Sequence, residues 1–344
     1  MVDKVAQVTD RHPNEVLEDG ALHIDHLCVA FPRRGAPLLA TYDVSLSLEK
    51  GRTLGVVGES GSGKSVTLRA ILGLVPYPGE VLAGEMEWGG EGFDLTKPRS
   101  LKRLRGHGIG MVFQDPMASL NPVVTIGDAL MEVLRRRSHK SKKEARTLAI
   151  ELLTRVGIPA PAQRFREYPH QLSGGMRQRV MIALAVAAQP RLLLADEPTT
   201  ALDVTIQEQV LDLLLEIQRE TGMSMILVSH DFGVISSCCD DVAVMYGGRV
   251  VECGSLKTVL ERPRHPYTRA LLGAVPRVPT EGQLVVEMEA IPGQPPAVRA
   301  LELGCIFAPR CTQARDECTQ VDMSLDEKSP SHGSACPFGE SSGD

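Results

Sequence analysis

An early segment of the chain carries a phosphate-binding motif. Residues 58–65 read GESGSGKS, which fits the pattern G-x-x-x-x-G-K-[ST]. Glycines at these positions let the backbone curl so that successive N–H groups point at phosphate oxygens. The lysine then reaches the outer phosphates, and the last serine can coordinate Mg²⁺. The motif predicts a nucleotide site made by Gly58, Ser60, Gly61, Ser62, Gly63, Lys64, Ser65 and Val66.

A pair of acidic residues could supply hydrolytic chemistry. The segment RLLLADEP places Asp196 and Glu197 at the end of an apolar run. We expect Asp196 to lie close to a Mg²⁺ ion, directly or through water. Glu197 faces the other side, where it can polarise an attacking water as a general base. Most such pairs are solvated strand ends, so the interpretation depends on the phosphate loop in the same chain.

Two other polar residues also end apolar runs. Gln114 closes GIGMVFQ, and His230 closes SMILVSH. In an open parallel sheet, the carboxyl ends of the strands share one edge, where ligands bind. We therefore expect both side chains to converge with the phosphate loop and the acidic pair.

A second helix start is also suited to binding an anion. In YPHQLSGGMRQR (168–179), Ser173 is a good N-cap, and the two glycines after it leave backbone N–H groups exposed. An ordinary capped helix can begin in the same way. Here, however, the chain's first phosphate site is already complete without this segment.

Four cysteines gather near the end of the chain with the spacing C-x₅-C-x₆-C-x₁₇-C: Cys305, Cys311, Cys318 and Cys336. They could form disulfides, bind zinc, hold an iron–sulfur cluster or be core residues. The spacing lacks the C-x₂₋₄-C pairs typical of structural zinc. Thiolates in irregular loops suit an iron–sulfur cluster, with zinc and metal-free thiols as alternatives. We expect the other cysteines to be core or incidental residues: Cys28, Cys238, Cys239 and Cys253.

Strands alternate with helices along the part of the chain that carries these residues. Apolar runs predict buried parallel strands at 53–58, 108–114, 191–196 and 224–230. Helical spacing predicts helices at 64–75, 173–188 and 203–222, the last of which ends at Gly222. This alternation indicates an α/β fold with a parallel sheet.

The composition along the chain suggests three parts. We expect a flexible tail at 1–20, a nucleotide-binding domain at 21–275 and an irregular, Pro- and Gly-rich extension at 276–344 that carries the four cysteines. Within the domain, residues from about 115 to 180 suggest a helical subdomain without strands.

Composition also excludes some functional classes. The chain has 344 residues, of which 43% are hydrophobic and 23% charged, and its net charge is −6. This mild acidity gives no reason to expect a nucleic-acid partner, and the basic run at 134–146 is typical of a solvated connection between helices. No apolar stretch is long enough for a membrane span, and the N-terminus lacks a signal-peptide core. We expect a soluble cytoplasmic protein without structural disulfides.

From about residue 21 to 275, the chain resembles the ATP-binding cassette (ABC) ATPases. The family's elements occur in order: Phe31 in CVAF, the phosphate loop, Gln114, LSGGM, LLLADEP, TALD (200–203) and His230 in LVSHD. Met176 stands where many members have Gln. The resemblance implies the ABC-type fold and ATP hydrolysis, with Phe31 on the adenine, Glu197 and His230 as catalytic residues and Mg²⁺ held by Ser65, Gln114 and Asp196.

The resemblance also implies a mechanical cycle. Two cassettes close head-to-tail, so that each ATP lies between the phosphate loop of one and the signature of the other. The signature residues would then act on the partner's nucleotide: Leu172, Ser173, Gly174, Gly175 and Met176. Asp203 would belong to the dimer loop, and His230 would hold the water and γ-phosphate in register with Glu197.

The segment GRVVECGSLKTVLERPRHPYTRALLGAVP (248–276) and the cysteine-bearing tail resemble the D-type subunits of dipeptide and oligopeptide importers. This implies peptide uptake, an F-type partner cassette, two membrane permeases, an indirect extracytoplasmic binding protein and a peripheral position on the cytoplasmic face of the inner or plasma membrane. It also implies a [4Fe–4S] cluster on the four cysteines. Import of nickel chelates or glutathione is the alternative, and action on ribosomes or DNA is a distant one. His265, between Pro263 and Pro266, is expected to be structural.

Overall fold

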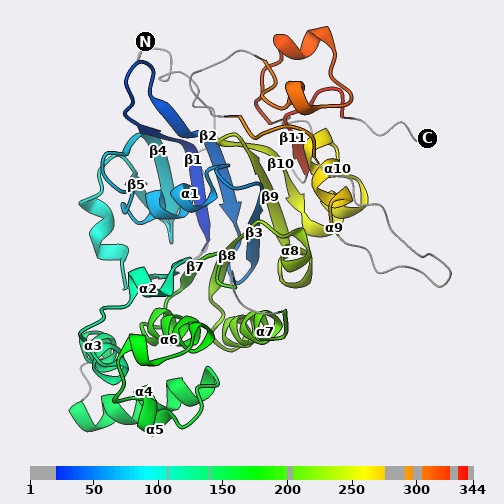
Figure 1. Cartoon of the computed structure of the whole chain (residues 1–344). Helices are drawn as coiled ribbons and strands as arrows, with labels where there is room; N and C mark the ends of the chain where they lie inside the picture. The colour runs from blue at the N-terminus through cyan, green and yellow to red at the C-terminus, as the bar shows by residue number, and fades with distance from the viewer. Residues whose placement is uncertain are drawn as a thin grey trace, which may run out of the picture.

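The computed structural model describes residues 21–106, 108–138, 141–199, 204–275, 291–296, 304–325 and 332–339. These residues build two sheets, a group of helices below them and a small irregular extension above (Figure 1). No helix among the described residues is long and apolar enough to cross a membrane.

The strands that the sequence predicted are four consecutive strands at one end of a seven-stranded sheet. They are β3 (Thr53–Val57), β6 (Ile109–Val112), β7 (Leu192–Asp196) and β8 (Ser224–Ser229). The sheet order is β11-β10-β9-β3-β8-β7-β6, and these four strands pair in parallel. Every residue of β3, β7 and β8 is buried, which explains why their sequences are continuously apolar.

The core strands are parallel as predicted, and two antiparallel strands at one edge make the whole sheet mixed. β9 (Asp241–Tyr246) runs parallel to β3, but β10 (Arg249–Ser255) returns antiparallel to β9. The turn between them is Gly247-Gly248, and both residues have positive φ, as a tight two-residue hairpin requires. The edge strand β11 (His332–Ser334) is antiparallel to β10 and comes from the C-terminal extension.

A second, antiparallel sheet in the order β2-β1-β4-β5 covers one side of the core. Its strands are β1 (Leu22–Phe31), β2 (Leu38–Leu48), β4 (Glu80–Trp88) and β5 (Glu91–Asp94). The helix α1 (Lys64–Ile71) contacts β1, β2 and β7, so it lies between the two sheets (Figure 1). Leu68 and Ile71 of α1 are fully buried there.

The helical region lies below the two sheets (Figure 1). Its described residues contain no strand and hold α2 (Pro116–Ser119), α3 (Ile126–Ser138), α4 (Lys142–Arg155), α5 (Pro161–Arg164), the short 3₁₀ turn η2 (Pro169–Gln171) and α6 (Gly174–Ala187). A capping box starts α4, because Ser141 and Glu144 satisfy each other's backbone N–H groups.

Of the remaining helices, only α7 (Val204–Thr221) was predicted from the sequence. The others are α8 (Phe232–Cys238), α9 (Leu256–Glu261) and α10 (Pro266–Gly273), with 3₁₀ turns η1 (Ser100–Leu104), η3 (Ala308–Arg310) and η4 (Asp316–Thr319). Gly222 follows the last residue of α7 with φ +68°, as expected of a helix-stopping glycine. The extension lies beside β10 and α10 (Figure 1).

Candidate functional site

The phosphate loop connects β3 to α1, as the motif requires. Gly63 has φ +102°, and a Cβ there would lie 2.5 Å from the carbonyl oxygen of Ala40, so only glycine fits. The Nζ of Lys64 donates to the carbonyl oxygens of Gly58 (2.7 Å) and Glu59 (3.0 Å). Burial lowers the pKa of Lys64, while nearby carboxylates oppose the shift. The ammonium is thus held in the loop where phosphate oxygens would replace those carbonyls.

The loop lines a pocket of about 670 Å³, a volume suited to a small-molecule ligand. The predicted contacts Phe31, Gln114 and Glu197 lie on its wall, together with residues 60–66 of the loop. Gly58 lies behind the wall, with Met245 so close that a Cβ at Gly58 would clash with its carbonyl oxygen. Sequence reasoning missed several wall residues that no motif signals: Arg33, Leu38, Leu39, Ala40, Tyr246, Gly247, Pro295 and Pro296.

Ser65, which lines this pocket, contacts the buried Asp196. The Ser65 hydroxyl donates to Asp196 Oδ1 at 2.7 Å. The other oxygen, Oδ2, is buried and has no hydrogen-bond partner among the described residues. Burial raises the pKa of Asp196 because the charged form loses its hydration. A hydroxyl beside an unsatisfied carboxylate oxygen is a fitting donor set for Mg²⁺.

The Glu197 side chain lies where the ends of β6, β7 and β8 come together. Its Oε2 accepts a hydrogen bond from Gln114 Nε2 at 3.0 Å and lies 3.3 Å from His230 Nδ1. The Glu197 side chain is only 10% exposed, whereas that of His230 is 56% exposed. Glu197 has φ +46°, a left-handed conformation that non-glycine residues adopt rarely and that concentrates at active sites. The structure thus places Gln114 on the candidate base.

The signature residues occupy a different part of the molecule. Ser173 caps α6 by accepting a hydrogen bond from the backbone N–H of Met176, and Gly174 is exposed with open space beside it. The helix α6 lies in the helical region, whereas α1 and the phosphate loop lie higher in the molecule (Figure 1). None of residues 172–176 is among the described residues that line the pocket. Asp203 lies outside the described residues.

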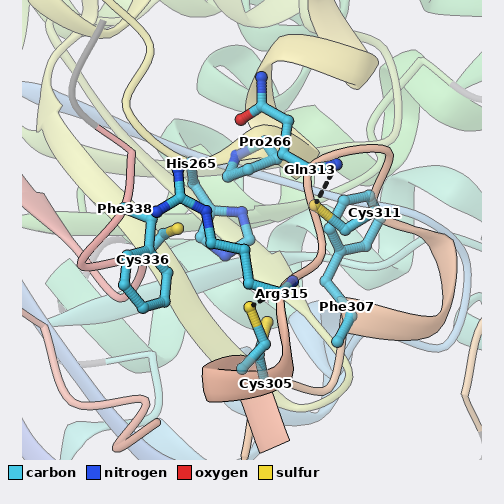
Figure 2. Close-up of a pocket in the computed structure, with 11 residues that line it drawn as sticks. His265, Pro266, Cys305, Phe307, Cys311, Gln313, Arg315, Cys336 and Phe338 are labelled. Carbon is cyan, nitrogen blue, oxygen red and sulfur yellow. Dashed lines mark hydrogen bonds between the residues drawn. The ribbon is translucent and has the colours of Figure 1, made fainter.

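The four C-terminal cysteines line one small cavity of about 20 Å³, as Figure 2 shows for three of them. All four thiols are free. The exposed Arg315 side chain lies among them, stacked on Phe338. Within the described part of the chain, no three His, Cys, Asp or Glu side chains are arranged to hold a single metal ion. Burial raises the pKa of Cys305 and of Cys336.

A buried histidine also faces this cavity. His265 is fully buried and caps α10, with its Nδ1 accepting from the backbone N–H of Tyr267 at 3.1 Å. Burial, aided by Arg269, lowers the pKa of His265 to about 3. The neutral ring therefore carries its proton on Nε2, which is buried and has no hydrogen-bond partner in the described structure. The structural role expected of His265 is confirmed, and its N–H is left as a donor beside the thiols.

Two family models match the chain. "ABC transporter" matches residues 41–200, and "Oligopeptide/dipeptide transporter, C-terminal region" matches residues 251–318. The dipeptide transport ATP-binding protein DppD of Escherichia coli K12 is 44% identical over 317 residues, which cover 92% of this chain and 96% of that protein. DppD of Bacillus subtilis 168 is 45% identical over 316 residues, covering 92% of this chain and 93% of that protein.

Solved structures agree with the fold. The dimeric, post-hydrolysis structure of the ATP-binding cassette MJ0796 bound to ADP and Pi gives a TM-score of 0.61 at 28% identity, covering 68% of this chain and 98% of that one. CbiO1 of Clostridium perfringens, part of the ABC transporter complex CbiONQ, gives a TM-score of 0.59 at 27% identity. The match covers 71% of this chain and 92% of CbiO1.

Proposed function

This chain belongs to the ABC transporter ATP-binding subunits of the dipeptide/oligopeptide importer family, and from that membership we propose that it powers peptide uptake through partner permeases. The observation that carries the ATPase part is the Glu197 carboxylate, held by Gln114 and faced by His230 beside the phosphate loop. The peptide cargo rests on the relatives named for dipeptide transport.

The residues divide the work of hydrolysis. Lys64 and the loop N–H groups stabilise charge that develops on the phosphates. Ser65 and Asp196 would hold Mg²⁺, which neutralises phosphate charge when bound. Glu197 takes a proton from the attacking water, and His230 orients that water and the terminal phosphate. Phe31, on the pocket wall, would stack on the adenine ring.

The signature completes a second site in another cassette. Residues 172–176 are exposed or half-exposed apart from the buried Leu172, and they begin a helix remote from the chain's own pocket. The matching cassette MJ0796 has been solved as a dimer with ADP and Pi. We therefore assign Ser173 and Gly175 to the partner's nucleotide and Asp203 to the dimer loop. The partner is an F-type subunit, and the pair sits on the cytoplasmic face of the membrane beneath two permeases.

We propose that the four cysteines hold a [4Fe–4S] cluster, which would join the extension of residues 276–344 to the cassette of residues 21–275. Backbone N–H groups of Gln313 and Arg315 donate to the sulfurs of Cys311 and Cys318, each at 3.4 Å. Such donors, with the His265 N–H, stabilise the electron-rich sulfurs of a cluster. A cubane is wider than one ion, so its ligands need not converge on a single point as zinc ligands do. Arg315 is exposed and can turn outward to make room.

Uptake by whole cells tests the cargo. A strain without this gene should lose accumulation of a radiolabelled dipeptide and regain it with the wild-type gene. The Glu197→Gln gene should fail to restore uptake. Normal dipeptide uptake together with lost uptake of a nickel chelate or glutathione would overturn the peptide proposal and leave the ATPase assignment intact.

A further inference from the structure

An arginine of the C-terminal extension forms an ion pair with the phosphate loop. Arg310 forms a two-pronged ion pair with Glu59, the second residue of that loop, although 251 positions separate them. Its two terminal nitrogens lie 2.6 and 2.9 Å from the two carboxylate oxygens. Arg310 is only 8% exposed, so solvent screens the pair weakly. The Glu59 carboxylate raises the pKa of Arg310, which keeps the guanidinium charged.

The same guanidinium holds a second segment against the nucleotide pocket. Its Nε donates to the carbonyl oxygen of Pro292 at 2.6 Å, and a terminal nitrogen donates to that of Ile291 at 3.4 Å. Three and four residues after Pro292, Pro295 and Pro296 line the pocket itself. The Arg310 guanidinium therefore binds both the start of the phosphate loop and the segment that leads to the pocket wall at Pro295 and Pro296.

Glu59 is also held by its main chain. Its backbone N–H donates to the hydroxyl of Tyr267 at 2.9 Å. Tyr267 is fully buried and packs against Tyr246 and Phe307, with ring centroids 4.5 and 5.4 Å away. Phe307 belongs to the same turn of the extension as Arg310, whose backbone N–H donates to the Phe307 carbonyl at 2.9 Å. The carboxylate and the main chain of Glu59 are thus fixed by the C-terminal part of the chain.

We propose that Arg310 is a positioning residue for the phosphate loop, through which the C-terminal extension sets the affinity of this cassette for ATP. The loop is rich in glycine, so a free loop loses much conformational entropy when it closes on phosphates. Anchoring Glu59 removes part of that loss before ATP arrives, which strengthens binding without a contact to ATP. The inference deepens the proposed ATPase function and rests on ATP binding at this site.

Nucleotide binding by the purified full-length chain tests this role. Fluorescent mant-ATP should bind the Arg310→Ala variant about tenfold more weakly than the wild type. Arg310→Lys keeps the charge but loses the planar fork, so we expect an intermediate loss. Arg136→Ala is the matched control, because it removes an exposed arginine–glutamate pair on α3 that is remote from the pocket. Circular dichroism and thermal melting verify that each variant is folded.

A double-mutant cycle and steady-state kinetics separate positioning from general damage. If Arg310 acts through Glu59, the Arg310→Ala/Glu59→Ala double variant should bind mant-ATP no more weakly than Arg310→Ala alone. In the assembled transporter, Arg310→Ala should raise KM for ATP and leave kcat within about twofold.

Wild-type affinity in folded Arg310→Ala, or additive losses in the cycle, would refute the positioning role. Should Arg310→Ala not fold, wild-type affinity in Arg310→Lys would refute it equally. A wild-type chain that fails to bind mant-ATP would contradict the ATPase proposal itself.

Discussion

The Nδ1 atom of His230 lies 3.3 Å from the Oε2 atom of Glu197. The two residues directly follow β8 and β7, which pair in parallel, so the sheet itself sets their separation. Gln114 reaches the same oxygen from the end of β6, the next strand in the sheet. A rigid scaffold thus presents one carboxylate to two polar partners, an arrangement suited to orienting a water for attack on a phosphate.

Glu197→Gln should abolish ATP turnover while ATP binding persists. The amide keeps the size and can still meet Gln114, but it cannot accept a proton from water. We expect phosphate release by the assembled transporter to fall at least about 100-fold, with mant-ATP affinity within about twofold of the wild type. Glu208→Gln, an exposed position on α7, is the control. Substantial turnover by Glu197→Gln would remove Glu197 as the base.

Asp196→Asn should stabilise the nucleotide-free protein but impair Mg²⁺-dependent hydrolysis. Burial raises the pKa of Asp196, so the folded protein holds this proton more tightly than the unfolded chain does. The stability from the protonated form is fully present below the ordinary pKa of 3.8 and is lost as pH rises through the raised value. At neutral pH, asparagine avoids burying the charge, and we expect Tm to rise by roughly 2–4 °C.

Differential scanning calorimetry at several pH values checks the Asp196 prediction. The gain in Tm over the wild type should shrink as the pH falls toward the acid range, because the wild-type carboxyl then becomes neutral as well. Asp212→Asn, at an exposed position on α7, provides the control for loss of one carboxylate. A lower Tm for Asp196→Asn at neutral pH would show that the buried charge is not costly.

Gly174→Asp should fold normally and bind ATP, yet stop turnover. A Cβ at Gly174 meets no atom within 4 Å, so the side chain itself fits. The new negative charge would face the phosphates of the partner's ATP and repel them. Gly92→Asp places the same charge at another open position and is the control. The expected readout is loss of phosphate release with unchanged mant-ATP binding; normal turnover would contradict action in trans.

If the four cysteines hold the proposed cluster, Cys311→Ser should remove it and loosen the extension. Anaerobically purified wild type is expected to be brown and to contain iron, whereas the variant should lose the visible absorbance and most of the iron. Cys238→Ser is the control, because this thiol donates to the carbonyl of Val234, as a serine hydroxyl can, and lies outside the cysteine cavity. If the wild-type protein is colourless and contains stoichiometric zinc, the cysteines bind zinc rather than an iron–sulfur cluster.

His265→Asn should separate the two roles of this buried side chain, which are capping α10 through Nδ1 and offering the Nε2–H to the cysteine cavity. Asparagine is a good N-cap, so it can still receive the backbone N–H of Tyr267, but it removes the imidazole Nε2–H from the cavity. We expect α10 to remain folded by circular dichroism and the iron to be released faster to a chelator. His265→Ala loses both tasks and should also lower Tm. Wild-type iron retention in His265→Asn would show that the N–H does not support the cluster.

Four strands of the seven-stranded sheet could be predicted because each is a short, apolar and almost wholly buried run, whereas the antiparallel sheet could not. The strands β1 and β2 pair with register shifts, and His26 and Asp43 within them have positive φ. These irregularities break the alternation that identifies a half-buried strand in a sequence. The antiparallel strand β10 was also not predicted, because no local sequence pattern marks its pairing with β9.

What the sequence determined by itself was which residues able to do chemistry occur at which spacing: the phosphate loop, the acidic pair, the signature and the four cysteines. Residue type and spacing, together with the family resemblance, predict their roles. Only the tertiary structure decided that Arg310 grips Glu59, that Pro295 and Pro296 wall the pocket and that β11 joins the sheet edge. Such contacts join segments far apart in the chain, and their partners are chosen by how the whole core packs rather than by any local pattern.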